Sequence, residues 1–188
     1  MNKEYIEAKL KELGIDDNYS ILDDGSIDVY GTVDISFKNL KVIPVRFRSV
    51  KGDFNCSNNQ LESLKGSPLS VGVSFFCHGN RLPTLEGAPQ SVGKAFICSN
   101  NILESLEGVP ETVSGTFNCS GNRLFSLEGG PQSVNGTFDC TNNNLATLEG
   151  IPEYVRQVLY CTGNNIPGDI IMKHKTMSSF LIISDEDK

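Results

Sequence analysis

The fold of this chain is decided by residues 54–68, which read FNCSNNQLESLKGSP. The same pattern returns at a constant step of 21 residues until the chain is nearly finished. It carries a phenylalanine, an asparagine, two leucines, a glycine, a proline, a valine and every cysteine of the chain: Cys56, Cys77, Cys98, Cys119, Cys140 and Cys161. A period of this length is typical of a stacked array, in which each unit buries its apolar side against its neighbours.

The centre of the unit, Phe-x-Cys-x-x-Asn-x-Leu-x-x-Leu, resembles the leucine-rich repeat. The match covers about residues 30 to 167 without an insertion, although Phe and Cys replace the usual strand leucines. Because 21 residues leave little room for a helix, we expect a mainly β solenoid of parallel strands with an irregular return path. The Cys-Ser-Asn-Asn and Leu-Glu-Gly elements look like the leucine-rich-repeat proteins commonly encoded by large tailed bacteriophages. This narrower resemblance implies a phage accessory protein and no established activity.

The order of residues within one unit predicts a strand followed by a bend. Side chains alternate along a strand, so Phe54 and Cys56 should face inward and Asn55 and Ser57 outward. The next position holds residues that readily take a left-handed backbone: Asn58, Gly79, Asn100, Gly121, Asn142 and Gly163. The asparagine that follows in each unit, such as Asn59, should be buried, with its amide bonding backbone groups that the bend leaves unpaired.

The repeat divides the chain into three parts. Residues 1–32 are expected to form an N-terminal cap, with an amphipathic helix over residues 3–13 and a hairpin around Asp24-Gly25. Residues 33–167 form the solenoid, starting with a degenerate unit that places Ile35, Leu40, Ile43 and Val50 at core positions. Residues 168–188 are expected to form a C-terminal cap from residues 170–172 and 180–183, followed by a mobile acidic tail at residues 185–188.

Composition narrows the range of functions. The net charge of −7 disfavours nucleic acid as the main partner, because such binders usually present a basic face. No apolar run reaches membrane-spanning length, and the first residues lack the apolar core of a secretory signal. We therefore expect no membrane partner and a cytoplasmic location, in the infected host cell if the chain is phage-encoded.

The cysteines are expected to be structural. Their 21-residue spacing contains no Cys-x-x-Cys pair and no matching histidines, so it favours small buried thiols over a metal site or a disulfide framework. The chain also lacks nucleophile-elbow, phosphate-loop and zinc-helix motifs. We expect no enzyme activity, no cofactor and no metal.

The candidate binding residues are those at which the repeat varies. The outward strand position reads Asn55, Phe76, Ile97, Asn118, Asp139 and Tyr160. Phe76 and Ile97 would form an apolar patch on the sheet face, with His78 beside it as an exposed histidine. Arg81 and Arg123 follow the repeated asparagine along one rim. Ordinary drift on a solvated face is the alternative.

These residues favour a non-catalytic module that binds a protein, and the phage resemblance makes a host defence or regulatory enzyme the expected target. A structural alternative is a virion-associated or self-assembling rod, so the oligomeric state stays open. A third reading is glycan or cation binding on the aromatic and acidic stripes. The acidic stripe recurs after the second leucine: Glu86, Glu107, Glu128 and Glu149, with Lys65 at the same place in an earlier unit.

Overall fold

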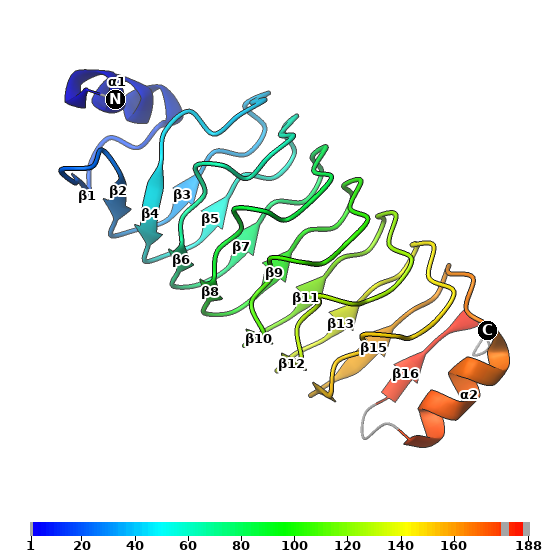
Figure 1. The fold of residues 1–188 in the computed structure, drawn as a ribbon. Helices are drawn as coiled ribbons and strands as arrows, with labels where there is room; N and C mark the ends of the chain where they lie inside the picture. The colour runs from blue at the N-terminus through cyan, green and yellow to red at the C-terminus, as the bar shows by residue number, and fades with distance from the viewer. Residues whose placement is uncertain (1, 178–180, 186–188) are drawn as a thin grey trace.

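The computed structural model describes residues 2–177 and 181–185 of the chain. The repeats stack as successive turns of an elongated β-solenoid, and the two ends of the chain lie at opposite ends of it (Figure 1). Consecutive turns pair residues one repeat apart, such as Phe54 with Phe75 and Phe75 with Phe96. The prediction of a mainly β solenoid with parallel strands is therefore confirmed.

One ladder of eight parallel strands runs the length of the molecule and carries the phenylalanine position of each turn. Its strands are β3 (Val33–Asp34), β5 (Phe54–Asn55), β7 (Phe75–Phe76), β9 (Phe96–Ile97), β11 (Phe117–Asn118), β13 (Phe138–Asp139), β15 (Val158–Tyr160) and β16 (Leu181–Ile183). Each strand has only two or three residues, so the stability of the ladder comes from stacking neighbouring turns.

A second ladder follows the valine position on the return path of each turn (Figure 1). One part contains β4 (Phe47–Val50), β6 (Ser70–Val71) and β8 (Ser91–Val92), and the other contains β10 (Thr112–Val113), β12 (Ser133–Val134) and β14 (Tyr154–Val155). The prediction of an irregular return path is wrong here. A two-residue strand is too short to show alternation in the sequence, and only the stacking of turns reveals it.

A helix covers the N-terminal end of the stack, as the sequence predicts. The helix α1 (Lys3–Leu13) begins at Asn2, whose side chain accepts a hydrogen bond from the backbone amide of Tyr5. It ends at Gly14, which is left-handed, and its apolar side chains Ile6, Leu10 and Leu13 are buried. These side chains join the hydrophobic core of the solenoid, so α1 shields the first turn from water.

The predicted hairpin is also present and extends the second ladder. Its strand β1 (Tyr19–Ile21) pairs antiparallel with β2 (Ile27–Val29), and β2 pairs in parallel with β4. The degenerate first unit follows, with Ile35, Ile43 and Val50 buried and Leu40 partly buried. The core positions expected for this unit are therefore confirmed.

The C-terminal end carries the helix α2 (Gly168–Met177) and the strand β16. Ile171 and Ile182 are buried, as expected for a cap, whereas Met172 is exposed. Because β16 pairs in parallel with β15, it continues the first ladder after the sequence repeat has ended.

The acidic tail differs from the expectation at its first residue. The carboxylate of Asp185 accepts a hydrogen bond from the backbone amide of Gly163 at 2.6 Å, so this residue is tied to the last turn. The prediction that Asp185 belongs to a mobile tail is wrong. Phe180 and residues 186–188 lie outside the described residues.

Columns of identical side chains fill the interior of the solenoid. The rings of Phe54, Phe75, Phe96, Phe117 and Phe138 stack with centroids between 5.1 and 5.9 Å apart. Beside them, all six cysteines are buried, which confirms the predicted column of buried thiols. Ser57 differs from the prediction because it is buried as well. Strand β5 ends at Asn55, so the alternation of faces does not extend to Ser57.

The repeated asparagine forms a hydrogen-bond ladder beneath the bend. The side-chain amide of Asn101 donates to the carbonyls of Cys77 and Cys98 at 3.1 Å each. Its side-chain oxygen accepts from the backbone amide of Leu82 at 3.1 Å. Equivalent bonds form at Asn80, Asn122 and Asn143, and these four asparagines are buried. The predicted hydrogen-bonding role of this residue is confirmed, and it includes Asn59, although Asn59 is only partly buried and not buried as predicted.

The bend explains why asparagine and glycine alternate along the chain. The six residues at this position have φ between 53° and 68°, as predicted. A Cβ atom added to Gly79 would lie 2.5 Å from Oδ1 of Asn58, and one added to Gly121 would lie 2.5 Å from Oδ1 of Asn100. The asparagine side chain of one turn therefore occupies the space above the glycine of the next turn.

We expect Gly121→Ala to destabilise the protein by more than the cost of a left-handed alanine, which is about 1 to 2 kcal/mol. The extra cost arises because the new methyl group displaces the side chain of Asn100. In an Asn100→Gly background only the backbone cost should remain. A double-mutant cycle measured by urea denaturation checks this coupling, and equal costs in both backgrounds would contradict it.

Candidate functional site

Five of the candidate residues lie side by side across the first ladder. Strand pairing places Phe76 next to Ile97, Ile97 next to Asn118, Asn118 next to Asp139, and Asp139 next to Tyr160. We call the aligned set the outer column: Asp34, Asn55, Phe76, Ile97, Asn118, Asp139 and Tyr160. Tyr160 is 36% exposed, and Phe76, Ile97, Asn118 and Asp139 are half-buried.

The polar members of the outer column support the end of their own strand. Oδ1 of Asn55 accepts hydrogen bonds from the backbone amide of Ser57 at 3.1 Å and from its hydroxyl at 2.6 Å. Asn118 holds Ser120 in the same way, and Asp139 accepts from the amide of Thr141 at 3.0 Å. Asn118 and Asp139, predicted as binding residues, thus have a structural role in closing the turn.

Phe76 and Ile97 cannot close the turn in this way because they have no side-chain oxygen. They are adjacent in register and interrupt an otherwise polar run in the first half of the outer column. The ring of Phe76 also stands perpendicular to the ring of His78, with centroids 6.4 Å apart. These two turns therefore lack the hydrogen bond between the outer-column side chain and the residue two positions later. In its place they present apolar surface on the sheet face.

His78 is only partly exposed, so the prediction of an exposed surface histidine is wrong. Its Nδ1 atom is buried and has no hydrogen-bond partner in the described part of the chain. Burial lowers the pKa of His78, because the charged imidazolium would lose solvation. The cause is its position between turns: the equivalent residues Ser57 and Ser99 are buried, and Ser120, Thr141 and Thr162 are partly buried. A larger ring placed there is partly covered as well.

Arg81 and Arg123 are exposed on the rim, as predicted. The left-handed residues Gly79 and Gly121 separate them from the outer column, so the structure does not place them on the same strand face. Within the described residues neither arginine forms an ion pair. Both therefore remain available to an acidic group on another molecule.

The thiols are not suited to react. Burial raises the pKa of Cys56 to about 12 and also raises the pKa of Cys77, Cys98, Cys119 and Cys140. The nucleophilic form of cysteine is the thiolate, and burial disfavours it. Among the described residues no group of three His, Cys, Asp or Glu side chains could hold a metal ion.

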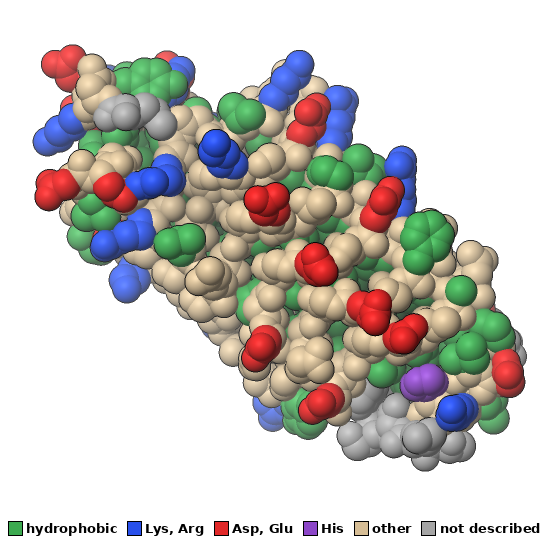
Figure 2. Space-filling model, in the orientation of Figure 1, with side chains coloured by type: hydrophobic (Ala, Val, Ile, Leu, Met, Phe, Trp, Pro, Cys, Tyr) green, Lys and Arg blue, Asp and Glu red, His purple; other side chains and the backbone are tan. Residues whose placement is uncertain are grey.

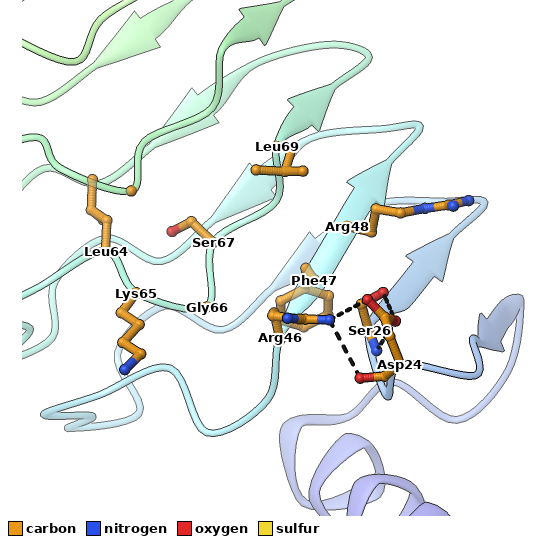
Figure 3. Close-up of a pocket in the computed structure, with 11 residues that line it drawn as sticks. Asp24, Ser26, Arg46, Phe47, Arg48, Leu64, Lys65, Gly66, Ser67 and Leu69 are labelled. Atoms are coloured by element: carbon orange, nitrogen blue, oxygen red, sulfur yellow. Dashed lines mark hydrogen bonds and ion pairs between the residues drawn. The ribbon is translucent and has the colours of Figure 1, made fainter. Parts of the chain in front are cut away.

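Two hollows that the sequence did not reveal lie beside each other near the N-terminal end. The first, with a volume of ≈ 370 Å³, has Phe47, Leu64 and Leu69 as its apolar lining (Figure 3). The second, of ≈ 410 Å³, is lined mainly by residues 42–45. Arg46, Lys65 and Gly66 border both hollows. They were missed because a hollow depends on the placement of neighbouring turns and has no short motif.

Charges are unevenly distributed over the surface. Figure 2 shows acidic side chains along the middle of the visible face, whereas basic side chains gather over the N-terminal elements and along the upper edge. The residues of the acidic stripe, Glu86, Glu107, Glu128 and Glu149, are exposed. Lys65 stands at the equivalent position in the turn before Glu86 and reverses the charge there.

The fold and these surfaces define the class of protein: a parallel-strand β-solenoid with turns of about 21 residues, capped by a helix at its first end and bearing a small helix at its second. No protein-family model matches the chain, and no curated protein is detectably similar to it in sequence. Among the described residues, no helix combines the length and the apolar character needed to cross a membrane.

Proposed function

We propose that this protein is a non-catalytic binding module whose outer column contacts a protein partner. The observation that carries this proposal is the pair Phe76 and Ile97. Asn or Asp at this position closes the turn in four other units, so packing does not require an apolar residue there. Apolar and aromatic side chains that are clustered and only half-buried are typical of protein interfaces.

The rigidity of the scaffold supports the same proposal. The outer column stands on eight paired strands, and the stacked rings and the asparagine ladder lie behind it. A surface fixed in this way loses little conformational entropy when it binds, which favours affinity. The buried, protonated thiols and the half-buried His78 also fit a binding role better than a catalytic one.

We further propose that the chain is a bacteriophage accessory protein and that its partner is a host bacterial protein, such as a defence or regulatory enzyme that it inhibits in the cytoplasm. This step rests on the resemblance of the repeat to phage-encoded leucine-rich-repeat proteins. The helices at the two ends disfavour the alternative of a rod that grows by end-to-end stacking.

The test replaces Phe76 and Ile97 together by asparagine, the residue that Asn55 and Asn118 supply in neighbouring turns. Because each asparagine can restore the turn-closing bond, we expect the Phe76→Asn, Ile97→Asn variant to stay folded. Capture of the partner from a bacterial host lysate, quantified by mass spectrometry, should fall about tenfold or more, as for the loss of an interface hot spot.

Phe125→Ala is the matched control, because Phe125 is an equally apolar side chain that is 64% exposed outside the outer column. Its capture of the partner should equal that of the wild-type chain. Capture that is lost with Phe125→Ala, or that is unchanged in the double asparagine variant, would move the binding surface away from the outer column.

A further inference from the structure

One turn departs from all the later turns at three alternate positions. Lys65 stands where the next four turns have Glu86, Glu107, Glu128 and Glu149. Ser67 stands where they have Ala88, Val109, Gly130 and Ile151. Leu69 stands where they have Gln90, Glu111, Gln132 and Glu153. Lys65, Ser67 and Leu69 all line the same ≈ 370 Å³ hollow (Figure 3). A ligand bound in this hollow would explain all three differences from the later turns.

The hydroxyl of Ser67 indicates that this hollow is built to bind. Ser67 is only 6% exposed, and its Oγ has no hydrogen-bond partner among the residues that the structure describes. A buried hydroxyl without a partner destabilises a protein, and alanine is used at the same position in the next turn. Leu69 is also unfavourable, but because an apolar side chain is exposed to water. It is 58% exposed at a position where later turns are polar. A ligand that enters the hollow would satisfy both residues.

The charge around the hollows selects an anionic ligand. Arg46 pairs with Asp24 (Figure 3). Arg48 pairs with Asp28, so both pairs are close to neutral. Lys65 has no ion-pair partner in the described part of the chain and borders both hollows. Screening limits surface electrostatics to about 10 Å at moderate salt, so this local excess of positive charge matters more than the net charge of −7.

The second hollow determines the shape of the ligand. It holds the apolar side chains of Val42, Ile43 and Val45, and Val42 is 64% exposed. Because Arg46 and Lys65 lie between the two hollows, a ligand that fills both must carry an anionic group between two apolar groups. A peptide provides this arrangement, since its backbone spaces the side chains and can also bond the hydroxyl of Ser67.

We propose that the paired hollows bind an acidic peptide segment in which apolar side chains flank one or more carboxylates. The acidic stripe of a second copy of this chain fits less well. Glu107 of that stripe, for example, lies between the buried Leu106 and Gly108, so it offers a carboxylate without exposed apolar neighbours. The hollows lie beside the second ladder, so this inference is independent of the outer column.

The test measures fluorescence anisotropy of labelled peptides in which Phe and Leu flank one, two or three Asp residues. Lys65→Glu, Ser67→Ala and Leu69→Gln each introduce the residue of the following turn, so folding should be retained. We expect Lys65→Glu to weaken binding about tenfold, because an attraction becomes a repulsion. Ser67→Ala should weaken binding while raising the unfolding temperature, and Leu69→Gln should weaken binding as well.

Two controls make the result specific. Lys94→Glu applies the same charge change at an exposed lysine outside the hollows and should leave peptide affinity unchanged. Peptides with Lys in place of Asp should bind more weakly than the acidic peptides, and added salt should reduce the difference. If the acidic peptides bind no better than the basic ones, the proposal is overturned.

Two further outcomes would also overturn it. A wild-type chain whose size grows with concentration, and which becomes monomeric with Lys65→Glu, would show that a second copy occupies the hollows. Peptide binding that survives all three hollow variants but is lost in Phe76→Asn, Ile97→Asn would place the peptide on the outer column. If the Phe76→Asn, Ile97→Asn variant loses partner capture but still binds the peptide, the outer column and the hollows are two separate binding surfaces.

Discussion

Stability should fall steeply above about pH 8.5, where cysteine in an unfolded chain is half ionised. Burial raises the pKa of five thiols in the folded state, so they keep their protons while the unfolded chain releases them. Each such thiol lowers the free energy of unfolding by up to about 1.4 kcal/mol per pH unit, and five together by about 7 kcal/mol. The stability that the neutral thiols contribute is intact below the unfolded pKa and is lost as pH rises toward the raised folded values.

A loss of this size exceeds the effect of most point mutations and approaches the whole stability of a typical domain, about 5 to 15 kcal/mol. Urea denaturation in the presence of a reductant, repeated at increasing pH, measures it directly. Cys98→Ala should reduce the slope by about 1.4 kcal/mol per pH unit, because one titrating group is removed. A stability that stays constant into the alkaline range would mean that the thiols ionise in the folded protein, against the buried column.

The thiol column also shows why much of this fold can be predicted from sequence. A side chain repeated at a constant step must lie directly above its counterpart, so Cys56 and Cys77 share one environment whatever the details of the turn. The same reasoning correctly predicted the burial of Asn101 and the left-handed backbone of Gly121. A single sequence does not normally show which distant residues are in contact. In a solenoid it does, because residues one repeat apart lie next to each other.

The failures arise where the environment differs from turn to turn or extends beyond the repeat. The sequence places His78 on the surface because serine or threonine fills that position in other turns, but Ser57 and Ser99 are themselves buried. The strand β16 has no repeat pattern, and its placement depends on the edge that β15 leaves open. The hollow around Ser67 is formed by neighbouring turns together with the N-terminal hairpin, so its pattern appears only when turns are compared position by position.

Replacing Asn101 by alanine should destabilise the protein by about 2 to 3 kcal/mol, since a buried backbone amide left without an acceptor costs about 1 to 3 kcal/mol and the weakened bonding of two carbonyls adds to it. The amide of Leu82 would lose its acceptor, whereas the carbonyls of Cys77 and Cys98 would each lose one donor and keep the other, from Asn80 and Asn122. Water cannot easily replace these bonds, because Asn101 is only 7% exposed. Asn144→Ala is the matched control, because Asn144 is exposed in the adjacent column and its loss should cost less than about 0.5 kcal/mol.

The Asn101→Asp substitution distinguishes the contribution of the side-chain donors from that of the side-chain acceptor. Aspartate has nearly the same shape and can still accept from the amide of Leu82, but its second oxygen would face the carbonyls of Cys77 and Cys98. Burial raises the pKa of such a carboxyl, and its protonated form can donate one hydrogen bond. We therefore expect acid to restore part of the lost stability, so that the deficit relative to the wild-type chain shrinks as the pH falls from neutral toward about 5. Urea denaturation at both pH values measures this deficit, and a deficit that does not change with pH would show that the amide donors are not what holds the bends together.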